Sequence, residues 1–145
     1  MLSSYLLAIK VFLKSNGVAV PIQASIYLDL ASYDLTKTTI AKKYLKNDHC
    51  KIVFIKQCKP EYIISDGLTS IKTFDFNDKD LKNPLDDKGF ACNFNIHVVK
   101  AGTFNALVGS FDTLLCDGVS LNTMPSQPVT HWMQSIFFID NPIEV

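Results

Sequence analysis

Charged residues are scarce in this sequence, and the two signs cancel. The 145 residues include 14 Lys or Arg and 14 Asp or Glu, so only 19% are charged and the formal net charge is zero. A chain without excess positive charge has no overall attraction for nucleic-acid phosphates or for an anionic membrane surface. We therefore expect neither nucleic acid nor a membrane among its partners. The 48% share of apolar residues excludes a disordered chain.

Glycine, proline and cysteine are also few. Six glycines and six prolines exclude a linker-rich or collagen-like chain. No apolar run reaches the roughly 20 residues that span a bilayer. The N-terminus lacks a positive charge before its apolar stretch and an A-x-A site after it, so it is a poor signal peptide.

The four cysteines form no C-x-x-C pair and stand at no metal-ligand spacing to the histidines: Cys50, Cys58, Cys92 and Cys116. We interpret them as free thiols in a reducing compartment, each a small apolar core residue. Common enzyme motifs are absent, since there is no G-x-G-x-x-G, P-loop, H-E-x-x-H or G-x-S-x-G. His97 lies on the polar face of an alternating segment and His49 in a polar stretch, so both are predicted to be solvated.

A helix is predicted at the N-terminus, from a serine cap at Ser3 or Ser4 to about Lys14. Gly17 can adopt the positive φ that stops it. Apolar residues at helical spacing form one stripe that needs a partner: Leu2, Leu6, Ile9 and Leu13, widened by Tyr5 and Phe12.

Beyond Gly17 the apolar period changes from 3.6 to 2, which predicts strands. In residues 24–30 the apolar side is predicted to be buried: Ala24, Ile26, Leu28 and Leu30 alternate with Ser25, Tyr27 and Asp29. Residues 90–99 alternate in the same way. Segments 104–115 and 133–140 are apolar on both faces, as in covered central strands. Asp117–Gly118 predicts a hairpin that joins 104–115 to 119–123.

The remaining segments complete a mainly β fold. Residues 37–46 could form a short helix, 52–55 a short strand, and 77–89 a charged loop. We expect residues 1–145 to be one domain, with at least five antiparallel strands in a barrel or sandwich, a leading α-helix and a short helical or irregular insertion.

His131 is the candidate functional histidine. It ends the segment 123–131, TMPSQPVTH, in which two prolines fix φ and stiffen the loop, and it stands beside the only tryptophan, Trp132. A stiff loop that presents an imidazole and a large aromatic ring can line a ligand pocket. The alternative is a structural Trp132 that plugs one end of a barrel with His131 capping it. The residues alone leave both open.

An ordered set of motifs resembles the protein arginine N-methyltransferases. Residues 121–134, LNTMPSQPVTHWMQ, are similar to the THW loop of that family, in which Thr and Pro-x-x-Pro precede Thr-His-Trp-x-Gln. Residues 105–112 look like the barrel strand before that loop. Residues 1–8 and 12–21 look like the helix and strand that lead into the barrel, and 71–75 also fit. The resemblance covers most of the chain in order, apart from about 31–59 and 77–89.

The resemblance implies the substrate-side part of such an enzyme. It implies an incomplete antiparallel β-barrel with a linking helix at 1–16 and a dimerisation-arm insertion at 31–59. It also implies that His131 is catalytic and pairs with an aspartate of the cofactor domain, and that Trp132 and Met1 line the arginine pocket. Thr-His-Trp favours asymmetric dimethylation. By alignment, this stretch follows the cofactor domain and its two glutamates and precedes the last barrel strands.

From the same resemblance, S-adenosylmethionine is expected in the parent enzyme and no cofactor on this chain. Arginine-containing proteins are the expected substrates, a second copy is a candidate partner, and the cytoplasm or nucleus is the expected location. The insertion departs from the family pattern, because it has neither a Trp nor a Tyr-Gly-Phe-Asp-Met-like segment; Tyr33, Tyr44 and Leu45 are either substitute anchors or ordinary residues. The competing hypothesis is a non-catalytic β-barrel module that binds peptides.

Overall fold

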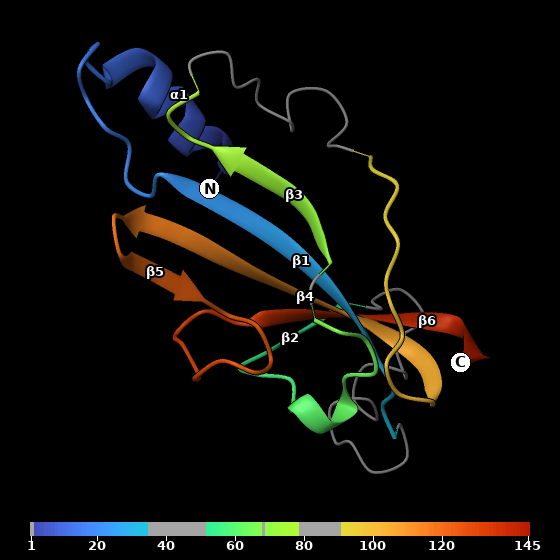
Figure 1. Cartoon of the computed structure of the whole chain (residues 1–145). Helices are drawn as coiled ribbons and strands as arrows, with labels where there is room; N and C mark the ends of the chain where they lie inside the picture. Colours follow the sequence, from blue (N-terminus) through green and yellow to red (C-terminus); the bar gives the residue numbers. More distant parts are fainter. Residues whose placement is uncertain (1, 35–51, 68, 79–90) are drawn as a thin grey trace.

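The computed structural model describes residues 2–34, 52–67, 69–78 and 91–145 (Figure 1). The elements in chain order are α1 (Leu2–Phe12), β1 (Gln23–Ala31), β2 (Ile52–Ile55), the 3-10 helix η1 (Pro60–Tyr62), β3 (Ser70–Asp75), β4 (Thr103–Cys116), β5 (Val119–Asn122) and β6 (Gln134–Glu144). No helix in this part of the chain is long and apolar enough to cross a membrane.

The strands form one antiparallel sheet in the order β2–β6–β4–β1–β3, with β5 also paired to β4. Within the described ranges, β2 and β3 each have one neighbouring strand, so the sheet does not close on itself. This confirms the prediction of a mainly β fold with an incomplete antiparallel barrel and a leading helix. Figure 1 shows β4 and β1 running diagonally across the molecule, with α1 near the β3 end.

The predicted hairpin between 104–115 and 119–123 is confirmed. β4 and β5 pair antiparallel, and Gly118 in the turn between them has φ +74°, where a side chain would be strained. The strands predicted at 52–55 and 133–140 correspond to β2 and β6.

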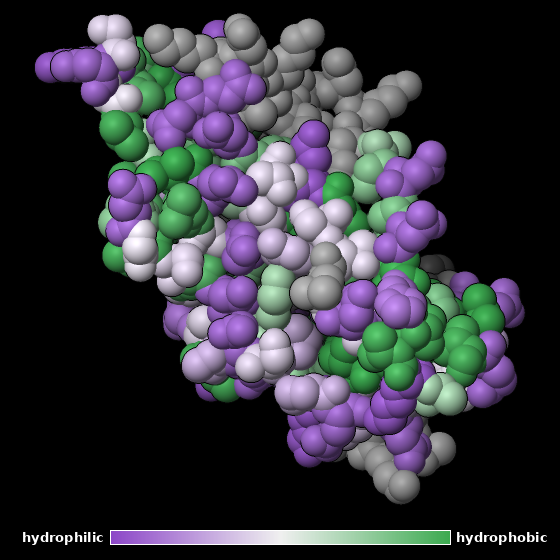
Figure 2. Space-filling view, viewed as in Figure 1, coloured by the Kyte–Doolittle hydropathy of each residue, from purple (hydrophilic) through white to green (hydrophobic). Residues whose placement is uncertain are grey.

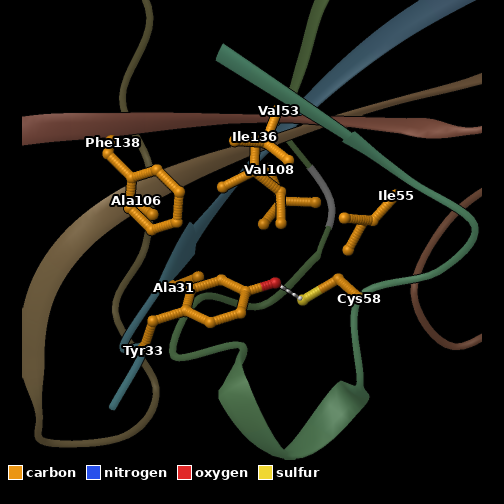
Figure 3. Close-up of a cluster of buried hydrophobic side chains, with 9 residues drawn as sticks. All are labelled: Ala31, Tyr33, Val53, Ile55, Cys58, Ala106, Val108, Ile136 and Phe138. Carbon is orange, nitrogen blue, oxygen red and sulfur yellow. Dashed lines mark hydrogen bonds between the residues drawn. The ribbon is translucent and has the colours of Figure 1, made fainter. Parts of the chain in front are cut away.

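The sheet has two unlike faces. What we call the core face carries one buried cluster, shown in Figure 3: Ala31, Tyr33, Val53, Ile55, Cys58, Ala106, Val108, Ile136 and Phe138. The residues that alternate with these form the opposite surface, which we call the groove face. Neighbouring residues therefore lie on opposite faces: Phe138 belongs to the core cluster, while Phe137 lines a groove.

The N-terminal helix is shorter than predicted and buries fewer of its apolar residues. It ends at Phe12 rather than near Lys14. Leu6 packs with Ala19, Phe74 and Phe76 in a second cluster that Tyr5 and Ile9 border. Phe12 and Leu13 are 80% and 37% exposed, so the predicted stripe was wrong at its C-terminal end, because the buried contacts of the helix stop at Ile9.

The burial predicted for residues 24–30 was correct for Leu30, which is 9% exposed, but wrong for the rest of the strand. Ser25 and Asp29, placed on the solvent side, are 4% and 2% exposed, whereas Ala24, Ile26 and Leu28 are only half-buried. The buried polar groups are bonded: the Ser25 and Thr73 hydroxyls share a hydrogen bond of 3.0 Å, and Ser65 donates to Asp29 at 2.9 Å. A polar strand face can be buried where such partners exist.

The alternating segment 90–99 is not a strand over residues 91–97. Only Val98 forms a single bridge, to Ser65, and Phe94 is 43% exposed. Alternation describes what a strand would look like but supplies no neighbouring strand to pair with. Here the neighbour is the segment 64–66, which is not a strand.

Three cysteines can be assessed, and all three are free thiols. Cys58 is buried, as expected of a core residue, but Cys92 and Cys116 are exposed, so that part of the prediction was wrong for them. His97 is exposed as predicted, with its ring 3.6 Å from a carboxylate oxygen of Asp66. Met1, His49, Cys50 and residues 37–46 and 79–90 lie outside the described residues.

Apolar side chains also gather on the outside. In the view of Figure 2 they concentrate near α1 and, on the other side, around the segment that precedes β4, with polar side chains between them. Exposed residues near α1 include Leu7, Val11, Val18 and Val20, and those of the other end include Phe94 and Val99.

Candidate functional site

The segment 123–133 connects β5 to β6 and presents His131 and Trp132. Its start is fixed on the sheet, because the Thr123 amide donates to the Phe111 carbonyl and the Phe111 amide donates to the Thr123 hydroxyl, both at 2.9 Å. A turn follows, with the Gln127 amide donating to the Met124 carbonyl at 3.0 Å. We call residues 124–133 the THW loop.

His131 and Trp132 lie together at the exposed end of this loop. Their rings meet edge to face, with centroids 6.0 Å apart and planes at 83°. The Thr130 hydroxyl donates to the Trp132 carbonyl at 3.1 Å, which tightens the backbone between them. Trp132 is 48% exposed, so the alternative in which it plugs the end of a barrel does not fit the structure.

The chemistry available at this end is that of an exposed imidazole beside an indole. Neutral imidazole both donates and accepts a hydrogen bond, and protonated imidazole donates two. No hydrogen bond or ion pair of the His131 ring is seen with any residue in the described part of the chain. The imidazole can therefore meet a carboxylate from outside, while the indole face forms a flat apolar wall.

Two glutamines that the sequence analysis missed hold this loop. The Gln57 side-chain amide donates to the carbonyls of Pro125, at 3.0 Å, and of Gln127. Gln134, 1% exposed at the start of β6, accepts from the Cys58 amide and donates to the Thr123 carbonyl. Gln134 lies in the segment 133–140, which the sequence analysis treated as apolar on both faces, so its polar side chain was the available signal. Gln57 had none.

A buried polar group at Cys58 adjoins the same place. Tyr33 donates its hydroxyl proton to the Cys58 sulfur at 2.9 Å, as the dashed line in Figure 3 shows. Burial raises the pKa of the Cys58 thiol to about 11, although the hydrogen bond from Tyr33 opposes this. Burial, with the hydrogen bond to Cys58 next, also raises the pKa of Tyr33. Neither group is a nucleophile near neutral pH.

The groove face carries a groove of about 420 Å³ close to the loop. Its walls are almost wholly apolar: Ile26, Leu28, Ile71, Leu107, Phe111, Met133 and Phe137, with Gly109, Ser110 and Ser135 also lining it. Met133 belongs to the THW loop and directly follows Trp132, so the groove extends to the residue next to the His131–Trp132 pair. A Cβ at Gly109 would stand 3.3 Å from the Phe137 ring, and glycine there keeps the floor low.

No metal centre is found among the residues that the structure describes, since they contain no group of three or more His, Cys, Asp or Glu that could hold an ion. Of the three site residues predicted from the sequence, His131 and Trp132 lie together, and Met1 falls outside the described ranges.

Comparisons with known proteins agree with this architecture. The family model described as the arginine methyltransferase oligomerization subdomain matches residues 24–145. A search of curated proteins finds no match. Among solved structures, the Trypanosoma brucei PRMT1 enzyme–prozyme heterotetrameric complex with AdoHcy is similar over 100% of this chain and 49% of its own, with 20% identity and a TM-score of 0.78.

A second similar structure is Arabidopsis thaliana protein arginine methyltransferase 10, described as a uniquely open conformation. The similarity covers 100% of this chain and 52% of that chain, with 19% identity and a TM-score of 0.73. At such identities the likeness shows a shared fold. The chain spans about half the length of the solved chains that it matches.

Proposed function

Because this chain belongs to the arginine methyltransferase family through its oligomerization subdomain, we propose that it forms the substrate side of a protein arginine N-methyltransferase. The reaction would be transfer of a methyl group from S-adenosylmethionine to a guanidinium nitrogen of a protein arginine. The observation that carries the proposal is the exposed His131–Trp132 pair on an anchored loop, within a matched family region.

The described residues do not fit the cofactor themselves. A nucleoside-type cofactor is commonly held where a strand turns into a helix N-terminus through a glycine-rich turn. Here α1 precedes every strand in the described ranges, and the two positive-φ glycines, Gly67 and Gly118, open no helix. We therefore place the cofactor on a separate domain.

His131 and Trp132 have distinct roles in this proposal. His131 pairs with a carboxylate of the cofactor-binding domain, and this contact fixes the THW loop against that domain. Trp132 walls the pocket in which the target arginine lies. Guanidinium remains protonated in water because its pKa exceeds about 12, so orientation of the target contributes much of the rate. Met1 as a pocket residue and asymmetric dimethylation as the product remain predictions.

The broader assignments are part of the same proposal. Residues 1–145 form one domain, with α1 (Leu2–Phe12) inside the linking segment predicted at 1–16 and an insertion at 31–59 as the arm-like element. Association with a second copy is expected, in line with the matched oligomerization subdomain. Arginine-containing protein substrates and a location in the cytoplasm or nucleus are also expected.

The test is a methyl-transfer assay on this chain joined to the cofactor-binding domain encoded with it or supplied by its partner. An arginine-containing peptide and labelled S-adenosylmethionine are the substrates. Replacement of His131 by Ala should lower kcat about 10- to 100-fold with a smaller change in KM, because misplacement costs orientation. His97→Ala is the matched control, since His97 is also exposed but lies elsewhere. Wild-type turnover in His131→Ala would remove His131 from the site.

The groove favours a second candidate, a peptide-binding module without chemistry. Its apolar walls can accept the side chains of an extended peptide. In that case Gly109→Ala, which raises the floor, would weaken peptide binding, whereas His131→Ala would not. Calorimetry with arginine-containing and arginine-free peptides separates the two functions, because only the enzyme requires the guanidinium.

A further inference from the structure

We propose that Gln57 is a positioning residue: its side-chain amide holds the THW loop against the segment that follows β2, and so sets where His131 and Trp132 lie. The functional weight of this inference rests on the function proposed above. The structural part does not, because it concerns only contacts within this chain.

The loop has little backbone pairing beyond the turn bond from the Gln127 amide to the Met124 carbonyl. Pro125 and Pro128 carry no amide proton, so two of its four residues from 125 to 128 cannot donate to a neighbouring strand. Their region still has carbonyl oxygens that need donors or water. The two carbonyls on either side of Ser126, those of Pro125 and Gln127, are the ones that receive the Gln57 amide.

The chemistry of Gln57 matches this task. A side-chain amide nitrogen carries two N–H donors, and both are used here on two carbonyls of the same turn. Gln57 is 68 and 70 residues away from these partners in sequence, so the contact is a long-range tie rather than a local turn. A glutamate of the same shape would offer acceptors only and would face two carbonyl oxygens.

The point to which Gln57 ties the loop is itself rigid. The next residue, Cys58, is 1% exposed, and its amide is bound by Gln134. Its sulfur receives the Tyr33 hydroxyl, and Tyr33 in turn exchanges two hydrogen bonds with the Asn105 side chain, of 2.8 and 2.7 Å. The tie therefore starts from the buried core cluster of Figure 3.

Gln134 secures the two ends of the loop to the same point. It connects the Cys58 amide to the Thr123 carbonyl, and it lies two residues after Trp132. With Gln134 at the ends and Gln57 at the turn, the position of the loop is determined by the segment 57–58. His131 and Trp132 are exposed and are held by the loop backbone rather than by packing of their own rings.

The sole tryptophan makes this testable without any enzymatic activity. Trp132 is 48% exposed and is the only fluorophore of its kind in the chain, so its quenching by acrylamide and its anisotropy report on the loop alone. In the complete chain, Gln57→Glu should raise the quenching constant about twofold and lower the anisotropy, because both N–H donors are lost. Hydrogen exchange of the peptide covering 123–134 should rise as well.

The matched control is Gln127→Glu. It adds the same charge to the loop, but the Gln127 side chain is exposed and only its backbone carbonyl takes part in the tie. This variant should behave as wild type. Acidification of Gln57→Glu below the carboxyl pKa, ordinarily about 4.3, should partly restore the wild-type quenching, because the protonated acid regains one donor.

Two results would overturn the inference: a folded Gln57→Glu with the quenching and exchange of wild type, or a Gln127→Glu that changes as much as Gln57→Glu. If Gln57→Glu does not fold by circular dichroism, Gln57→Ala is measured in the same way and decides. A loop that responds to Gln57 but yields no methyl transfer with the cofactor domain would contradict the proposed function and leave this positioning role intact.

Discussion

The core face and the groove face of the sheet are formed by the same strands, whose successive side chains point to opposite faces. On the core face, apolar side chains pack around Tyr33 and Cys58, and the buried Ser65 and Asp29 are hydrogen-bonded to each other. On the groove face, Ile26, Leu107 and Phe137 are only half-buried and line an open groove. Side-chain type alone does not distinguish the faces, since large apolar residues stand on both.

The difference teaches that burial follows from what covers a face. Two residues of the predicted insertion cover the core face near β2 and β6. These are Tyr33 and Cys58, which lie on either side of residues 35–51, outside the described ranges. On the groove face, α1 covers only the β3 end, where Leu6 meets Phe74. The rest of that face has no cover within the described residues, and this leaves a groove next to the THW loop.

The largest difference in stability between the two faces is expected at two adjacent phenylalanines of β6. Phe138→Ala should destabilise the fold by about 3–5 kcal/mol, because the ring is buried and packs edge to face on Tyr33, with centroids 5.8 Å apart. Phe137→Ala should cost clearly less, since its ring already borders solvent. Equilibrium urea unfolding measures both. Equal losses would mean that the groove is covered in solution.

A second test compares thiols. With a pKa of about 11 and almost no exposure, Cys58 should react with a maleimide or iodoacetamide about 100-fold more slowly at pH 8 than the exposed Cys92 and Cys116. Mass spectrometry of the digested protein gives the rate at each site. Rapid labelling of Cys58 in the folded protein would show that the core face opens near β2.

The buried carboxyl on β1 provides a pH test. Burial raises the pKa of Asp29, the nearby charge of Asp66 adds to this, and the hydrogen bond from Ser65 opposes it. The folded-state pKa of Asp29 lies above its unfolded-state pKa. The contribution of Asp29 to the free energy of unfolding is therefore complete at acid pH and is lost as the pH rises through the folded-state pKa. Asp29→Asn should therefore flatten the loss of stability that urea unfolding measures as the pH rises above about 4, the ordinary carboxyl pKa. Asp117→Asn, in an exposed turn, should keep the wild-type profile.

The smallest effect is expected at Ser110 on β4. Its hydroxyl is buried and has no hydrogen-bond partner among the residues described here. Replacement by Ala removes this unsatisfied group and should stabilise the fold by about 1 kcal/mol, or raise Tm by a few degrees. A loss of stability would indicate that an ordered water or another residue satisfies the hydroxyl.

Most of the strands could be predicted from the sequence because their signals are local. The long apolar segments of β4 and β6, the short β2 and the Asp117–Gly118 turn each follow from neighbouring residues. The failures share one cause. Residues 91–97 alternate without a strand partner in the described ranges, and Leu13 has helical spacing but lies beyond the end of α1 and is 37% exposed.

The candidate site also has features that local sequence predicts and features that depend on contacts with distant segments. Two prolines and the Thr130–His131–Trp132 motif lie within one short segment, so the sequence by itself determined a stiff loop and its family resemblance. Only the tertiary structure decided what holds that loop, because Gln57 and Gln134 act on partners 68 to 76 residues distant along the chain. The same holds for Ser25 and Asp29, whose burial depends on hydroxyls from other segments. A local pattern reports which groups a segment offers; the approach of distant segments decides which of those groups find partners.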